Sequence, residues 1–124
     1  MSRQTYLLDQ FLYKKSLERE RLRLATIDKV RQILKQMSEI IFFREVYLFG
    51  SITQPHRFFE KSDIDVAFVG LKDEDFFPAL AYLSRSLKRD VDIVQLEKHR
   101  LREKIIKEGI LLWTRQGFPS SSPK

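Results

Sequence analysis

The chain has 124 residues and a formal net charge of +6, from 23 Lys and Arg against 17 Asp and Glu. This length suffices for one domain with a single core, and 43% of the residues are hydrophobic. The absence of Cys excludes disulfides and thiolate metal sites, and two His, His56 and His99, are too few and too far apart for a zinc site. No apolar stretch is long enough to span a bilayer. The N-terminus has no apolar core followed by a small-residue cleavage site, which a secretion signal requires. We therefore expect a cytoplasmic protein with no membrane partner.

The positive balance favours a polyanionic partner, such as a nucleotide, a nucleic acid or an acidic protein surface. Most basic residues, however, stand among Glu on segments predicted as helices, as at 18–23. A solvated helix face of mixed charge is therefore the preferred interpretation, and nucleic acid is not the partner we expect.

The first 49 residues contain neither Gly nor Pro, and apolar residues recur there at steps of three and four. This spacing predicts an amphipathic helix at about 16–41. Residues 5–13 form either a shorter helix or an N-terminal extension of the long one. Their apolar side chains can pack on the domain or on a partner, and local packing is the interpretation we favour.

Strand and helix patterns alternate after the long helix, and they predict a single α/β (α+β) domain. Asp73 or Asp75 can cap the second helix, Pro78 is tolerable in its first turn, and Gly109 can end the third helix. The predicted elements are strands at 45–50, 63–69, 90–96 and 110–113, a loop at 51–62, and helices after Asp73 and at 98–108.

Two short motifs carry the chemistry. Gly50-Ser51 ends an apolar strand, and a turn without a side chain lets backbone N–H groups approach a phosphate, to which the Ser51 hydroxyl adds a donor. Asp63 and Asp65 begin the next strand and share one face, because alternate side chains of a strand do so. Two carboxylates this close repel one another unless a cation separates them, and Mg²⁺ prefers such hard oxygen ligands.

Asp92 lies between two apolar residues on the next predicted strand, so its side chain faces away from them. If the strands pair in the expected register, Asp92 meets Asp63 and Asp65, either to ligate a second metal ion or to accept a proton from an attacking hydroxyl. Asp90 has the same parity and is a weaker candidate. The alternative interpretation is a tight turn followed by acids that merely face solvent.

The segments Leu48-Phe-Gly-Ser51, Ser62-Asp-Ile-Asp65 and Val91-Asp-Ile-Val94 resemble the DNA polymerase β-like nucleotidyltransferase superfamily, and most of all its minimal nucleotidyltransferase (MNT) proteins. The resemblance covers about residues 25–115, which leaves 1–24 as a helical extension and 116–124 as a flexible tail. It implies a mixed sheet flanked by helices, ATP as donor and Mg²⁺, in two copies, as cofactor. It also implies that Gly50, Ser51 and Ser62 bind the nucleotide and that Asp63, Asp65 and Asp92 bind metal as the catalytic acids.

Small members of this group often act as antitoxins beside HEPN-domain RNases, and some transfer AMP to a tyrosine of the toxin. The resemblance therefore implies adenylyl transfer from ATP to a hydroxyl of a HEPN toxin. Two alternatives stay open: an antitoxin that only occludes its partner, with residues 6–13 docking there, and transfer to a small molecule or an RNA end. One departure concerns the loop 51–62, which lacks the usual Arg-Gly; Arg57 or Lys61 can substitute at a phosphate, and His56 is either a phosphate donor or, as we prefer, only a loop residue.

Overall fold

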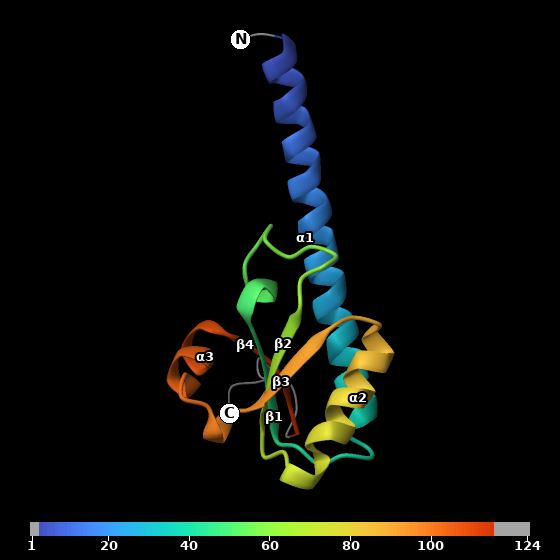
Figure 1. The fold of residues 1–124 in the computed structure, drawn as a ribbon, viewed down its shortest axis with the longest axis vertical. Helices are drawn as coiled ribbons and strands as arrows, with labels where there is room; N and C mark the ends of the chain where they lie inside the picture. Colours follow the sequence, from blue (N-terminus) through green and yellow to red (C-terminus); the bar gives the residue numbers. More distant parts are fainter. Residues whose placement is uncertain (1–2, 116–124) are drawn as a thin grey trace, which may run out of the picture.

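The structure, a computed structural model, describes residues 3–115 as a four-stranded sheet with three α-helices (Figure 1). None of these helices is both long and apolar enough to cross a membrane. The predicted tail at 116–124 lies outside the described residues. In chain order the elements are α1 (Arg3–Met37), β1 (Glu45–Phe49), the 3₁₀ turn η1 (Gly50–Thr53), β2 (Ile64–Val69), η2 (Asp73–Asp75), α2 (Phe76–Leu87), β3 (Val91–Gln95), η3 (Leu96–Lys98), α3 (Arg102–Glu108) and β4 (Ile110–Thr114).

The sheet is mixed, as the resemblance implied, with strand order β3-β2-β1-β4. β1 runs antiparallel to both β2 and β4, whereas β2 and β3 are parallel and are joined through α2. The parallel pairing sets Asp65 opposite Asp92, and the antiparallel pairing sets Phe49 opposite Asp65. The end of β1 and the beginnings of β2 and β3 therefore meet at one edge of the sheet.

The two faces of the sheet are covered unequally. α1 and α2 pack on one face around a large core that includes Leu34, Leu48 and Phe68, all without solvent exposure. The other face carries a small cluster of Ala67, Leu96 and Ile105, the last from the short helix α3. Asp65 shares the parity of Ala67, so it lies on this less covered face, where a ligand can approach.

α1 is one uninterrupted helix of 35 residues, about 50 Å long, and its N-terminal part extends well beyond the sheet (Figure 1). Residues 5–13 therefore extend the long helix at its N-terminal end, which was one of the two expectations, and do not form a separate short helix. The helix ends at Met37. A turn follows, in which the Ser38 N–H donates to the Leu34 carbonyl and the Ile41 N–H donates to the Met37 carbonyl.

The preference for local packing of residues 5–13 was wrong. The large apolar side chains of this segment, namely Tyr6, Leu7, Leu8, Phe11, Leu12 and Tyr13, are each between 54% and 67% exposed. Helical periodicity identifies the helix but does not show where along it the domain stops covering the apolar face.

Two details of the second helix also differ from expectation. Asp75 holds the N-cap position of α2, but its side chain makes no capping hydrogen bond. The Asp73 carboxylate instead accepts hydrogen bonds from Gln95 and Lys98, which fasten η2 to the end of β3. Phe77, in the first turn of α2, is 73% exposed.

Candidate nucleotidyl-transfer site

The turn at Gly50 is the first component of the site. Gly50 begins η1 directly after β1 and has φ +80°, a left-handed conformation that suits Gly. Its α-carbon faces the Asp65 carboxylate so closely that a Cβ atom at this position would collide with Oδ2. The Thr53 hydroxyl donates a hydrogen bond to the Gly50 carbonyl at 2.7 Å, and the Gln54 N–H donates to Ser51. The turn is therefore held in shape and lies against a carboxylate.

The acids form the second component. Asp63 and Asp92 are exposed, whereas Asp65 is half-buried between them. Burial, together with the negative charges of Asp92 and Asp63, raises the pKa of Asp65 to about 6. The structure thus brings the three predicted acids within electrostatic reach of one another, at the edge of the sheet beside Gly50.

Three neighbouring carboxylates, two of them exposed, are a donor set of hard oxygens that fits Mg²⁺. Their mutual repulsion is the condition that a divalent cation relieves. Within residues 3–115, however, no three Asp, Glu or His side chains already stand in the arrangement of a metal site. The assignment of Asp63, Asp65 and Asp92 as metal ligands thus remains a prediction.

A cavity of about 240 Å³ opens beside the turn, between η1 and α3. Its walls combine apolar side chains with one cation and one carboxylate. The lining residues are Phe49, Gly50, Thr53, Gln54, Leu101, Lys104, Ile105, Glu108 and Gly109. No feature of the sequence pattern distinguished α3 as a wall of the site, because a short basic helix at the surface has the same appearance.

Arg89 is a residue of the site region that the sequence analysis did not identify. Its Nη2 donates to the carbonyl oxygens of Phe59 at 2.9 Å and Ser62 at 2.7 Å, and its guanidinium packs over the Phe58 ring at 4.6 Å. Its Nε is buried and has no hydrogen-bond partner within the described chain. Burial lowers the pKa of Arg89, which the charges of Glu60 and Asp63 partly oppose. Arg89 thus fixes the end of the loop that leads into Asp63.

Two further polar residues of the loop, Ser62 and His56, contact protein groups. The Ser62 hydroxyl accepts a hydrogen bond from the Phe59 N–H, which closes a turn just before Asp63. His56 lies against α1, where its ring contacts Ser16, so the interpretation as a loop residue agrees with the structure better than that of a phosphate donor. Arg57 and Lys61 are exposed.

Proteins that transfer nucleotidyl groups combine a small-residue turn for the phosphates with carboxylates on the adjoining strands. The mixed sheet and the edge at Gly50 and Asp65 place this chain in that class. The chain belongs to the polymerase beta nucleotidyltransferase family, because the family model described as "Polymerase beta, Nucleotidyltransferase" matches residues 28–117. This confirms the superfamily resemblance seen in the motifs.

Solved structures show the same similarity. A crystal structure of a toxin–antitoxin with AMP-PNP matches with a TM-score of 0.57 at 28% identity, over 73% of this chain and 74% of that chain. The toxin–antitoxin MntA-HepT matches with a TM-score of 0.53 at 26% identity, over 75% and 74% of the two chains. A nucleotidyltransferase from Sulfolobus solfataricus, whose assignment is itself provisional, shares the fold, with a TM-score of 0.54 at 23% identity over 86% and 94%. No curated protein sequence matches the chain.

Proposed function

We propose that this protein is a cytoplasmic, Mg²⁺-dependent nucleotidyltransferase that transfers the adenylyl group of ATP to a hydroxyl of a toxin protein of the HEPN class and thereby neutralises it. The observation that carries the proposal is the Asp65 carboxylate, which lies between two other carboxylates and against the α-carbon of Gly50. Family membership supports the reaction type. The similarity to toxin–antitoxin complexes, one of them with AMP-PNP, supports the nucleotide and the kind of partner.

In this proposal the backbone N–H groups of the Gly50–Ser51 turn, with the hydroxyls of Ser51 and Ser62, bind the phosphates of ATP. Asp63, Asp65 and Asp92 hold Mg²⁺, which supplies positive charge against the departing phosphates. The acceptor oxygen forms a bond to the α-phosphorus, the bond from that phosphorus to the bridging oxygen breaks, and pyrophosphate leaves. Asp92 is exposed and is the group that receives the proton of the acceptor hydroxyl.

The cavity between η1 and α3 is where we place the nucleoside of ATP. Leu101 and Ile105 offer apolar surface to the base, and Lys104 offers a positive charge near the phosphates. The cavity adjoins Gly50, so a nucleotide bound there reaches the carboxylates with its phosphates.

The test is transfer of label from ATP to the protein encoded beside this chain's gene, in the presence of Mg²⁺. We expect labelling by the wild type and none by Asp63→Asn or Asp65→Asn, because each variant removes a ligand charge. Asp28→Asn is the matched control, since its side chain is 61% exposed on α1 and lies outside the site. Unchanged labelling by both site variants would overturn the assignment. Labelled RNA ends and small hydroxyl compounds, offered as acceptors in parallel, test the alternative substrates.

A second candidate is an antitoxin that acts by occlusion, without transfer. The observation in its favour is the exposed apolar surface of residues 6–13, on the part of α1 that extends past the sheet. A toxin partner seated on this surface would bury side chains that are otherwise in water. If Asp65→Asn still protects cells from the toxin, occlusion suffices; if protection is lost while the complex persists, transfer is required.

A further inference from the structure

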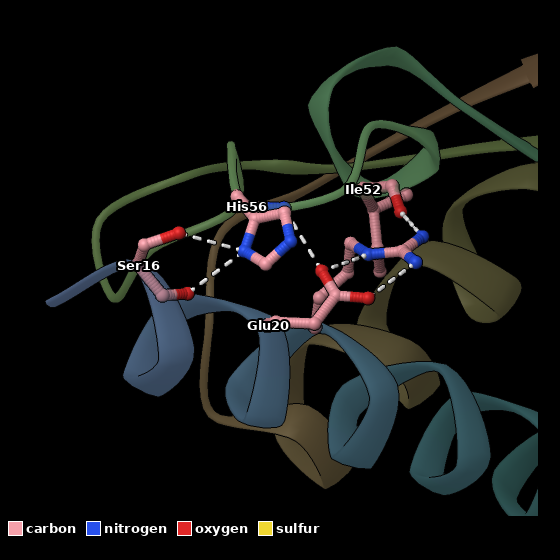
Figure 2. Close-up of polar contacts among 5 residues, drawn as sticks. Ser16, Glu20, Ile52 and His56 are labelled. Carbon is pink, nitrogen blue, oxygen red and sulfur yellow. Dashed lines mark hydrogen bonds and ion pairs between the residues drawn. The ribbon is translucent and has the colours of Figure 1, made fainter. Parts of the chain in front are cut away.

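α1 contacts the loop 51–62 through polar residues that the family match at 28–117 does not include. We define the helix–loop cluster as Ser16, Glu20 and Arg23 of α1 with Ile52 and His56 of the loop (Figure 2). We propose that Glu20, Arg23 and His56 are positioning residues that fix the Gly50–Ser51 turn for ATP. This inference rests on the proposed function and adds to it a part of α1.

Arg23 is the centre of the cluster. It is only 9% exposed, although Arg is rarely buried unless it is paired. Its Nε and Nη2 donate to the two carboxylate oxygens of Glu20, at 3.0 and 2.8 Å. The remaining Nη1 donates to the Ile52 carbonyl at 3.1 Å. Such charge-assisted, bidentate pairing fixes the orientation of the guanidinium. The guanidinium in turn holds the Ile52 carbonyl, a backbone group of η1.

His56 provides the second attachment. Its backbone N–H donates to Glu20 Oε1 at 2.8 Å. Its ring Nδ1 lies 2.8 Å from Ser16 Oγ and 3.1 Å from the Ser16 carbonyl oxygen. Glu20 therefore serves both attachments, and the hydrogen bonds from Arg23 and His56 lower the pKa of Glu20 to about 2. Figure 2 shows the His56 ring between Ser16 and Glu20.

The backbone of His56 has φ +65°, a left-handed conformation that is unfavourable for a non-Gly residue. Such a conformation persists where the surroundings over-determine it. At His56 the contacts to Ser16 and Glu20 supply this constraint, because they hold both the ring and the backbone N–H against α1.

The cluster acts on the turn through a short length of chain. Ile52 belongs to the same 3₁₀ turn as Gly50 and Ser51, and the Gln54 N–H donates back to the Ser51 carbonyl. A carbonyl held by Arg23 two residues after Gly50 therefore limits the motion of the N–H groups that face the phosphates. The far end of the loop is held separately by Arg89, so the helix–loop cluster restrains the phosphate end.

The experiment compares Arg23→Ala and His56→Gly with the wild type. Gly keeps the left-handed conformation at position 56 and removes only the ring. Arg31→Ala is the matched control, because Arg31 also pairs with an acid three residues earlier on α1, and its side chain is 40% exposed. Binding of a fluorescent ATP analogue is measured together with amide hydrogen exchange of residues 50–62.

We expect Arg23→Ala to weaken nucleotide binding about tenfold, as loss of a hydrogen bond from a charged donor implies, and to accelerate exchange in the loop. The KM for ATP should rise more than kcat falls, and Arg23→Lys should restore part of the loss, since it keeps the charge. A purely structural role predicts lower thermal stability with unchanged KM in the folded protein. Equal binding and equal exchange in Arg23→Ala, His56→Gly and Arg31→Ala would overturn the proposal.

If the wild type binds no ATP analogue, the proposed function fails, and with it the claim that the cluster serves a nucleotide. The exchange measurement still decides whether the cluster holds the loop: fast exchange of the His56 amide in the wild type would contradict the geometry itself. The two failures are therefore distinguishable.

Discussion

Replacing Asp65 with Asn should stabilise the metal-free protein while it abolishes transfer. Burial, together with the charges of Asp92 and Asp63, raises the pKa of Asp65 from its ordinary value of 3.8 to about 6. A carboxyl whose pKa is raised by folding contributes stability that is fully present below pH 3.8 and is lost as the pH rises through 6. At neutral pH the ionised Asp65 therefore costs folding free energy, and the neutral Asn side chain of nearly the same shape avoids that cost.

The magnitude follows from the size of the shift. A rise in pKa from 3.8 to about 6 corresponds to about 3 kcal/mol at most. Asp65 is only half-buried, and solvent screening reduces this to roughly 1 kcal/mol. For a domain of this size, 1 kcal/mol raises the melting temperature by about 4 °C.

The assay is thermal unfolding of the wild type and Asp65→Asn in EDTA, at pH 7.5 and at pH 4. We expect the variant to melt higher at pH 7.5 and the difference to shrink at pH 4, where Asp65 is protonated in the folded wild type. Asp28→Asn removes the same charge from an exposed position and controls for the change in net charge. Addition of Mg²⁺ should raise the melting temperature of the wild type more than that of Asp65→Asn. A variant that melts no higher than the wild type at pH 7.5 would refute the account of repulsion at this site.

Three other outcomes follow from the same geometry. Gly50→Ala should lose ATP binding and destabilise the fold by about 1–2 kcal/mol, measured by urea unfolding, because its φ is +80° and its Cβ would meet Asp65; wild-type binding would contradict this. Arg89→Ala should destabilise by roughly 1–3 kcal/mol, because it leaves the carbonyls of Phe59 and Ser62 without their donor, and an unchanged urea midpoint would count against the role given to Arg89. Removal of Mg²⁺ with EDTA should stop transfer to the partner protein, and its restoration should recover the labelling; transfer that continues in EDTA would exclude the metal-dependent scheme.

The part of the site that lies on strands could be predicted from the sequence, since strand geometry leaves few choices. Ile64 and Val66 are buried while Asp65 between them is not, as alternation requires. The expected register placed Asp92 beside Asp65, and the structure has that pairing, between parallel strands. The functional roles of these acids remain predictions, because the pairing establishes proximity and not ligation.

The loop 51–62 could not be predicted, because its conformation depends on long-range contacts. His56 reaches Ser16, forty positions earlier, and Arg89 reaches Phe59, thirty positions earlier. No local pattern distinguishes the buried Arg23 or the half-buried Arg89 among the 23 basic residues of the chain. The loop departs from the family pattern in lacking Arg-Gly, and its two ends are held instead by Arg23 of α1 and by Arg89, which lies between α2 and β3.

α1 connects three parts of the molecule that the sequence presents as separate. Its last turns pack in the core with Leu34, its middle holds the loop through Glu20 and Arg23, and its first turns carry the exposed apolar side chains of residues 6–13. The helix runs without a break through residues 24 and 25, between which we expected the nucleotidyltransferase domain to begin. That domain boundary stays a prediction. All three parts lie on one continuous helix. A partner bound at residues 6–13 would come within about one helical turn of Ser16 at Tyr13, so partner binding and order in the Gly50–Ser51 turn should depend on the same helix.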